Sequence, residues 1–110
     1  MSTVESSADY LAKRHPAVHA PFFDHMRAAV DAAGPLDDRT RELIMLAGYV
    51  VAGQPRAFQV HLRRALAAGA SPEAVRHAVL VTLGASATLE QVVNALRWVD
   101  AGLAEQESVS

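Results

Sequence analysis

One glutamate and one histidine near the middle of the chain are the residues whose types and spacing best suit proton transfer. Glu42 lies near the start of one predicted helix and His61 lies in the middle of the next, with a turn centred on Gly53-Gln54 between them. If these helices form a hairpin, the helical rise places Glu42 roughly 17 Å and His61 roughly 11 Å above the turn. A glutamate side chain or one water can close that gap, so the spacing permits a proton relay.

Both residues also have ordinary structural explanations. An acid in the first turn or so of a helix, such as Glu42, stabilises the helix dipole. A histidine on a helical face, such as His61, is often a partly buried polar residue without a chemical role. Ala57 and Ala65 share its face, and small neighbours leave the kind of space that a pocket requires. On the residues alone, the structural explanations are the more common ones.

Two arginines lie on the same predicted helix as His61 and are weak candidates for binding a substrate carboxylate. Arg64 comes three residues after His61, on a neighbouring part of the same face, and Arg56 lies near the start of the helix. Most arginines at such positions are solvated surface residues. We therefore expect Arg64, and more weakly Arg56, to contact substrate only if a site forms around His61.

The other histidines do not predict a metal site. His15 and His19 are four residues apart, which suits two ligands on one helix. However, Pro16 lies between them and is expected to begin a new helix, and no third ligand is evident. His25 and His77 fit exposed helix positions, so we predict no metal and no other cofactor.

Composition narrows the classes of function. The chain has 110 residues, a length typical of one domain, and 51% of them are hydrophobic. Ten basic residues against twelve acidic ones argue against nucleic acid and against a polybasic membrane patch. No apolar run reaches the roughly 20 residues that cross a bilayer, and the polar, acidic start is unlike a signal peptide, which favours a cytoplasmic location. The absence of cysteine excludes disulfides and thiolate chemistry.

Helix signals recur along the whole chain, and no segment is typical of a strand. Apolar residues repeat every three to four positions, and Asp37, Gly53, Pro55 and Thr88 mark helix starts and stops. The pattern predicts an all-α fold of about six helices with a central antiparallel hairpin, and a frayed tail over residues 105–110. The expected helices cover residues 8–14, 17–33, 38–52, 55–68, 72–83 and 89–103.

Two segments resemble a known family. Residues 36–44, Leu-Asp-Asp-Arg-Thr-Arg-Glu-Leu-Ile, resemble its acid-rich helix start followed by Arg-Glu-Leu. Residues 61–75, His-Leu-Arg-Arg-Ala-Leu-Ala-Ala-Gly-Ala-Ser-Pro-Glu-Ala-Val, are similar to its His-x-x-x-Ala-Leu-x-x-Gly-Ala-(Ser/Thr)-x-Glu-Glu-(Ile/Val) stretch. This is the pattern of the carboxymuconolactone decarboxylase and alkylhydroperoxidase D group. The resemblance spans about residues 36–103, within one domain over residues 1–110 whose core is expected at about 17–104.

The resemblance distinguishes two branches of chemistry. The peroxidase branch carries a Cys-x-x-Cys before the histidine, and Gln54 and Ala57 occupy those positions here, so peroxidase activity by such thiols is excluded. The resemblance thus implies a cofactor-free decarboxylase, or a related lyase or isomerase, acting on a small unsaturated lactone or carboxylic acid. His61 would be the general acid, with Glu42 orienting it or relaying the proton. The alternative is a non-catalytic oligomeric scaffold that binds a small molecule or a protein.

Self-association is a further expectation. The segments 17–33 and 89–103 carry many large apolar residues, which one core or a subunit interface could use equally well. The resemblance implies a homotrimer or homohexamer, and we predict a hexamer. The residues that raise this question are Phe22, Phe23, Met26, Val92, Val93, Leu96 and Trp98.

Overall fold

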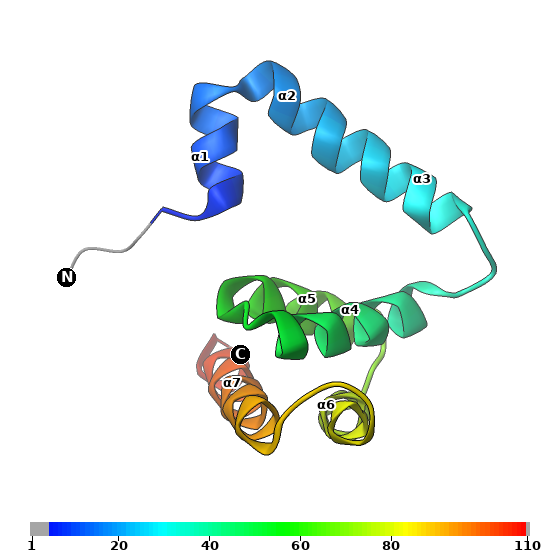
Figure 1. Cartoon of the computed structure of the whole chain (residues 1–110), viewed down its shortest axis with the longest axis vertical. Helices are drawn as coiled ribbons and strands as arrows, with labels where there is room; N and C mark the ends of the chain where they lie inside the picture. The colour runs from blue at the N-terminus through cyan, green and yellow to red at the C-terminus, as the bar shows by residue number, and fades with distance from the viewer. Residues whose placement is uncertain (1–4, 110) are drawn as a thin grey trace. The chain divides into compact units, whose positions relative to one another are not determined.

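The computed structural model describes residues 5–109, and these residues form helices without any strand. The all-α prediction is therefore confirmed. Counting α2, η1 and α3 as one continuous helical run, and η2 with α6, the described chain has the expected six helical segments. The elements in chain order are α1 (Ser7–Arg14), α2 (Pro16–Ala20), the π-helical turn η1 (Pro21–His25), α3 (Met26–Ala32), α4 (Asp38–Ala52), α5 (Pro55–Ala67), α6 (Pro72–Val81), the 3₁₀ turn η2 (Thr82–Gly84) and α7 (Leu89–Val109) (Figure 1).

The chain divides into two compact units, with the boundary between Leu36 and Asp37. The first unit contains α1, α2, η1 and α3, and none of the residues in these helices is buried. The single helix expected over residues 17–33 is interrupted by the π-helical turn that begins at Pro21. Proline has no N–H to donate, so the regular hydrogen-bond ladder shifts at that residue. The prediction of one domain over residues 1–110 stays a prediction.

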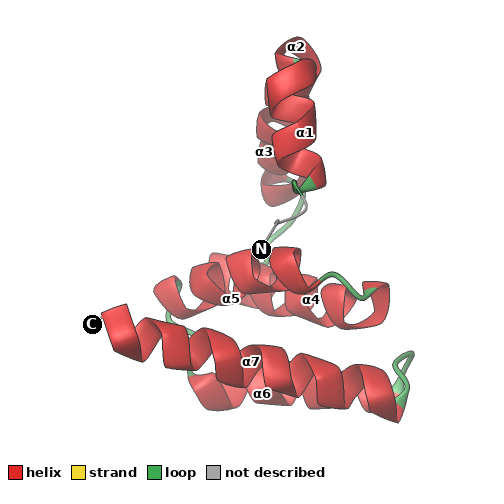
Figure 2. Cartoon of the chain, turned by 90° about the vertical axis from the view of Figure 1, so that its left-hand side faces the viewer, coloured by secondary structure: helices red, strands yellow, loops and turns green. Residues whose placement is uncertain are grey.

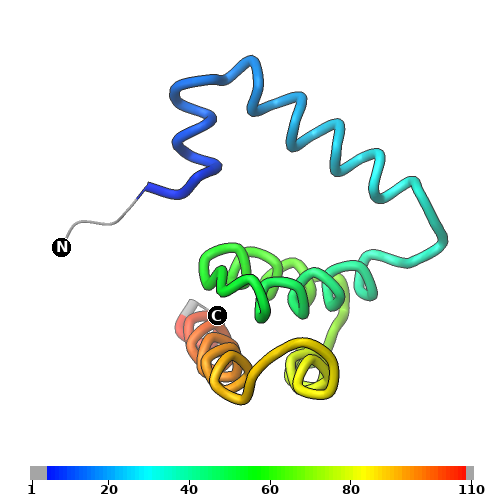
Figure 3. The backbone as a smooth tube through the Cα atoms, viewed as in Figure 1, coloured from blue at the N-terminus to red at the C-terminus, as the bar shows by residue number. Residues whose placement is uncertain are grey.

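The second unit is built on the predicted hairpin of α4 and α5. Asp37 caps α4 by accepting a hydrogen bond from the backbone N–H of Thr40, at 2.8 Å. Gly53 ends α4 with a left-handed φ of 67°, a conformation that glycine adopts without steric cost. Pro55 then begins α5 at a position where its missing N–H costs nothing. Figure 3 traces this tight reversal, which brings α5 back along α4.

The core of the second unit lies between two helical layers. One layer contains α4 and α5, and the other contains α6 and α7 (Figure 2). The rings of Phe58 and Trp98 meet edge to face across the layers, with centroids 5.4 Å apart. The buried apolar side chains that fill the core are Leu46, Val50, Phe58, Leu62, Ala65, Ala70, Val75, Val79, Val92, Ala95 and Val99.

The last two helices begin as the sequence predicts, but α7 is longer than expected. Ser71 caps α6, and Thr88 and Gln91 form the reciprocal capping box of α7. The prediction of a frayed tail is wrong for residues 105–109, because α7 continues to Val109. This end includes Ala104, Glu105, Gln106 and Glu107, residue types with high helix propensity, so a helix needs no packing partner to explain it. Ser110 lies outside the described residues.

Within the described residues, no helix combines the length and the apolar composition that a bilayer span requires. The cytoplasmic location stays a prediction.

Candidate active site

Glu42 and His61 are in direct contact. Nδ1 of His61 lies 2.5 Å from Oε2 of Glu42, so no water is needed between them. Both side chains are largely buried, with 10% of His61 and 13% of Glu42 exposed. The two candidates that the sequence placed on adjacent helices therefore form one carboxylate–imidazole pair.

The position of Glu42 weakens its ordinary structural explanation. It is the fifth residue of α4, beyond the first turn, and the acid that does occupy that turn is Asp38. Favourable interaction with the helix dipole falls off within the first turn. The carboxylate of Glu42 instead lies against α5, where His61 supplies its hydrogen-bond partner.

The contact assigns different roles to the two ring nitrogens of His61. An ionised carboxylate only accepts hydrogen bonds, so Nδ1 is the nitrogen that donates to Glu42. Nε2 has no hydrogen-bond partner among the described residues. The one buried polar side-chain atom without a partner in that part of the chain is Oε1 of Gln59, so Nε2 retains contact with solvent. Nε2 is therefore the atom through which His61 can exchange a proton with a ligand.

A third side chain, Tyr49, completes the surroundings of the imidazole. Its ring lies against the ring of His61, with centroids 5.2 Å apart and planes inclined by 32°. Sequence reasoning missed this residue. The available signal was its position seven residues after Glu42, which places the two side chains on the same face of α4, two turns apart.

The small residues beside His61 do not both leave space. Ala65 is fully buried in the core, so the region on its side is filled by packing. Ala57 is only partly buried. Ala65 therefore does not provide the space beside the imidazole that the sequence predicted.

The two arginine candidates are exposed residues of α5. Neither Arg56 nor Arg64 bonds to the carboxylate or to the imidazole, so the structure does not bring them together with Glu42 and His61. No group of three or more metal-ligating side chains occurs in the described part of the chain.

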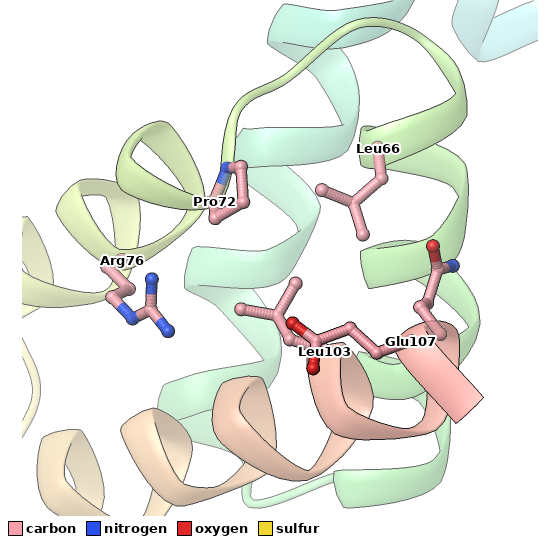
Figure 4. A pocket seen from close by; sticks show the side chains of 6 residues that line it. Leu66, Pro72, Arg76, Leu103 and Glu107 are labelled. Atoms are coloured by element: carbon pink, nitrogen blue, oxygen red, sulfur yellow. The ribbon is translucent and has the colours of Figure 1, made fainter. Parts of the chain in front are cut away.

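A separate depression of about 470 Å³ lies where α5, α6 and the end of α7 meet (Figure 4). Its lining does not include Glu42 or His61. Arg76 belongs to the lining, and its Nη2 lies 3.3 Å from Oδ1 of Asp100. The residues that line the depression are Leu66, Pro72, Arg76, Leu103, Gln106 and Glu107.

The described chain is thus an all-α protein whose central hairpin holds one carboxylate against one imidazole, and its sequence has no cysteine. The family model for the Carboxymuconolactone decarboxylase family matches residues 16–101 of this chain. The chain therefore belongs to that family. No curated protein and no solved structure matches it.

Proposed function

We propose that this protein is a cofactor-free decarboxylase, or a related lyase or isomerase, that acts on a small unsaturated lactone or carboxylic acid. The observation that carries the proposal is the 2.5 Å contact between Glu42 and His61, two largely buried side chains. A carboxylate that engages Nδ1 leaves Nε2 as the nitrogen that gives up and recovers a proton. Family membership supports the reaction class.

In a decarboxylation, the bond between the carboxylate carbon and its neighbouring carbon breaks and carbon dioxide leaves. The electron pair of that bond passes into the conjugated carbonyl of the substrate and forms an enolate. Nε2 of doubly protonated His61 then donates a proton to carbon, while Glu42 stabilises the imidazolium before the transfer. A proton from water restores His61, so the cycle consumes one proton for each carbon dioxide released. An isomerase would use the same pair to move a proton between two carbons.

Substrate anchoring is a separate part of the proposal. A substrate with a second carboxylate needs a cation near the pair, and Arg64 is three residues, about one helical turn, from His61 on α5. Arg56 lies further away, near the start of the helix. We expect Arg64→Ala to raise KM more than it lowers kcat, because an anchor contributes to binding in the ground state and in the transition state alike.

A substrate screen with matched variants tests the proposal. Lactone acids and keto acids are incubated with the wild type, His61→Ala, Glu42→Gln and the control His77→Ala, and carbon dioxide release and ultraviolet absorbance are followed. His77 is an exposed residue of α6, so its loss should leave turnover unchanged. Loss of a general acid lowers rates by on the order of 10²–10⁴-fold, which is the result expected for His61→Ala. Turnover that survives this substitution removes His61 from the mechanism.

We also propose that the protein functions as a homotrimer or homohexamer. Exposed large apolar side chains in both units support this proposal, because apolar surface left in contact with water can take part in association. Sedimentation velocity across a range of protein concentrations measures the assembly, and a monomer at all concentrations would contradict it. Large apolar residues with more than a third of their surface exposed are Tyr10, Val18, Phe22, Phe23, Met26, Val30 and Leu36 in the first unit and Ile44, Met45, Val51, Leu80, Val81, Leu83 and Leu89 in the second.

A further inference from the structure

Two side chains of α4 contact the imidazole of His61, which lies on α5. Glu42 contacts Nδ1 at 2.5 Å, and the ring of Tyr49 lies against the imidazole ring with centroids 5.2 Å apart. Glu42 and Tyr49 are separated by two turns of α4, so both side chains face α5. One rigid element therefore provides both a hydrogen bond and a packing surface to the same ring.

These two contacts constrain different motions. A hydrogen bond through Nδ1 opposes rotation of the ring only while it is intact, and the terminal torsion of a histidine is broad, so the ring can tilt about this contact and turn over when the bond breaks. The ring of Tyr49, inclined by 32° with its centroid 5.2 Å from that of the imidazole, occupies space beside the imidazole and opposes that movement. The hydrogen bond with Glu42 thus needs a second contact if Nε2 is to keep one direction.

We propose that Tyr49 is a positioning residue, which keeps Nδ1 of His61 on Glu42 and Nε2 toward the ligand. This inference rests on the proposed function for its consequence in turnover, but its structural content can be measured without any substrate. The aromatic ring of Tyr49 carries the effect, because it is the ring that contacts the imidazole. The hydroxyl of Tyr49 has no hydrogen bond with any described residue, so the Tyr49→Phe variant should keep the orientation of His61.

The competing explanation is that Tyr49 only fills space. It is partly buried and packs against the core, so its removal also affects stability. A purely structural role predicts a loss of stability with no change in the state of His61. The decisive readout is therefore the tautomer of the imidazole, which reports the ring nitrogens directly.

The experiment is histidine-selective ¹⁵N nuclear magnetic resonance on the full chain. The variants are Tyr49→Phe, Tyr49→Leu and Tyr49→Met, with Met45→Leu as the control on the exposed face of α4. In the wild type, Tyr49→Phe and the control, neutral His61 should show one tautomer, with the proton on Nδ1. In the leucine and methionine variants we expect averaged ¹⁵N shifts, because the ring exchanges between orientations. Circular dichroism checks that each variant is folded. If Tyr49→Leu does not fold, Tyr49→Met takes its place in the comparison.

Unchanged ¹⁵N shifts in a folded leucine or methionine variant would overturn the inference, because Glu42 alone would then orient the ring. Once the screen has identified a substrate, Tyr49→Leu should lower kcat by on the order of 10-fold or more with little change in KM, and Tyr49→Phe should restore it. The two proposals fail separately. If His61→Ala abolishes turnover but Tyr49→Leu changes neither kcat nor the tautomer, only the role of Tyr49 is lost. If the tautomer responds but His61→Ala leaves turnover intact, the proposed reaction fails.

Discussion

Nδ1 of His61 and Oε2 of Glu42 are joined at 2.5 Å although nineteen positions separate the residues in the chain. The contact ties α4 to α5 through two side chains that are largely buried. Because buried polar groups are costly without partners, each residue depends on the other for its place in the fold. The same pair therefore has consequences for stability as well as for chemistry.

Removing the carboxylate of Glu42 should destabilise the protein. Glu42→Ala leaves Nδ1 of His61 without its partner in a largely buried position, at a cost of about 1–3 kcal/mol in the free energy of unfolding. Glu42→Gln keeps an acceptor and should cost less. Urea denaturation measures the difference, with Glu73→Ala as the control because Glu73 is an exposed first-turn acid of α6. Equal losses for the two alanine variants would mean that Glu42 acts only on the helix dipole.

Substitution by alanine should lower the stability of the protein at Gly102 and raise it at Gly48. A Cβ on Gly102 would collide with the side chains of Gln59 and Leu62, so Gly102→Ala should destabilise by about 1–3 kcal/mol. A Cβ on Gly48, within α4, would meet nothing within 4 Å, so Gly48→Ala should stabilise by about 0.5–1 kcal/mol. Thermal and urea unfolding of both variants test the pair. A tolerated alanine at Gly102 would show that α5 and α7 can move apart there.

The capping box of α7 should contribute measurably to stability. The N–H of Thr88 donates to Oε1 of Gln91, and the N–H of Gln91 donates to Oγ1 of Thr88. Thr88→Ala should cost about 0.5–2 kcal/mol, and Thr88→Ser should cost little because it keeps the hydroxyl. Gln91→Ala should cost more than Thr88→Ala, since Gln91 also donates to the carbonyl of Val51 at 3.2 Å. Calorimetry ranks the stabilities of the three variants. A smaller loss of stability for Gln91→Ala than for Thr88→Ala would exclude a contribution from the bond between Gln91 and Val51 of α4.

Acid should weaken the start of α4 through Asp37. Hydrogen bonding from Thr40, through its side chain and then its backbone, holds the pKa of Asp37 below its ordinary value, and Arg39 and Arg41 add to the effect. Because the pKa is lower in the folded state, the stabilisation is present above the unfolded value of roughly 4 and is lost as the pH falls through the folded value. Asp37→Asn keeps a capping oxygen that does not titrate.

The expected result is that the wild type loses stability relative to Asp37→Asn as the pH is lowered below about 4. Urea midpoints measured from pH 7 to pH 2 provide the comparison. A constant difference between the two proteins over this range would show that the cap does not depend on the charge of Asp37.

Family membership, the helix order and most helix boundaries could be predicted from the amino-acid sequence alone. Asp37, Ser71 and Thr88 cap their helices through bonds that span three residues, so the information lies in the immediate sequence. Two details of the predicted helices were incorrect, and both have local causes. Pro21 shifts the helical ladder into a π-helical turn, and α7 extends to Val109 on helix propensity.

The candidate site could be predicted only in part. Residue types and spacing identified Glu42 and His61 and permitted their approach, because a hairpin turn fixes roughly how high each residue lies on its helix. Their direct contact, the ring of Tyr49 and the close approach of Gly102 to Gln59 were decided by the packing of whole helices. Local hydrogen bonds set where a helix begins and ends, whereas the rotation and spacing of neighbouring helices depend on how all core side chains fit together.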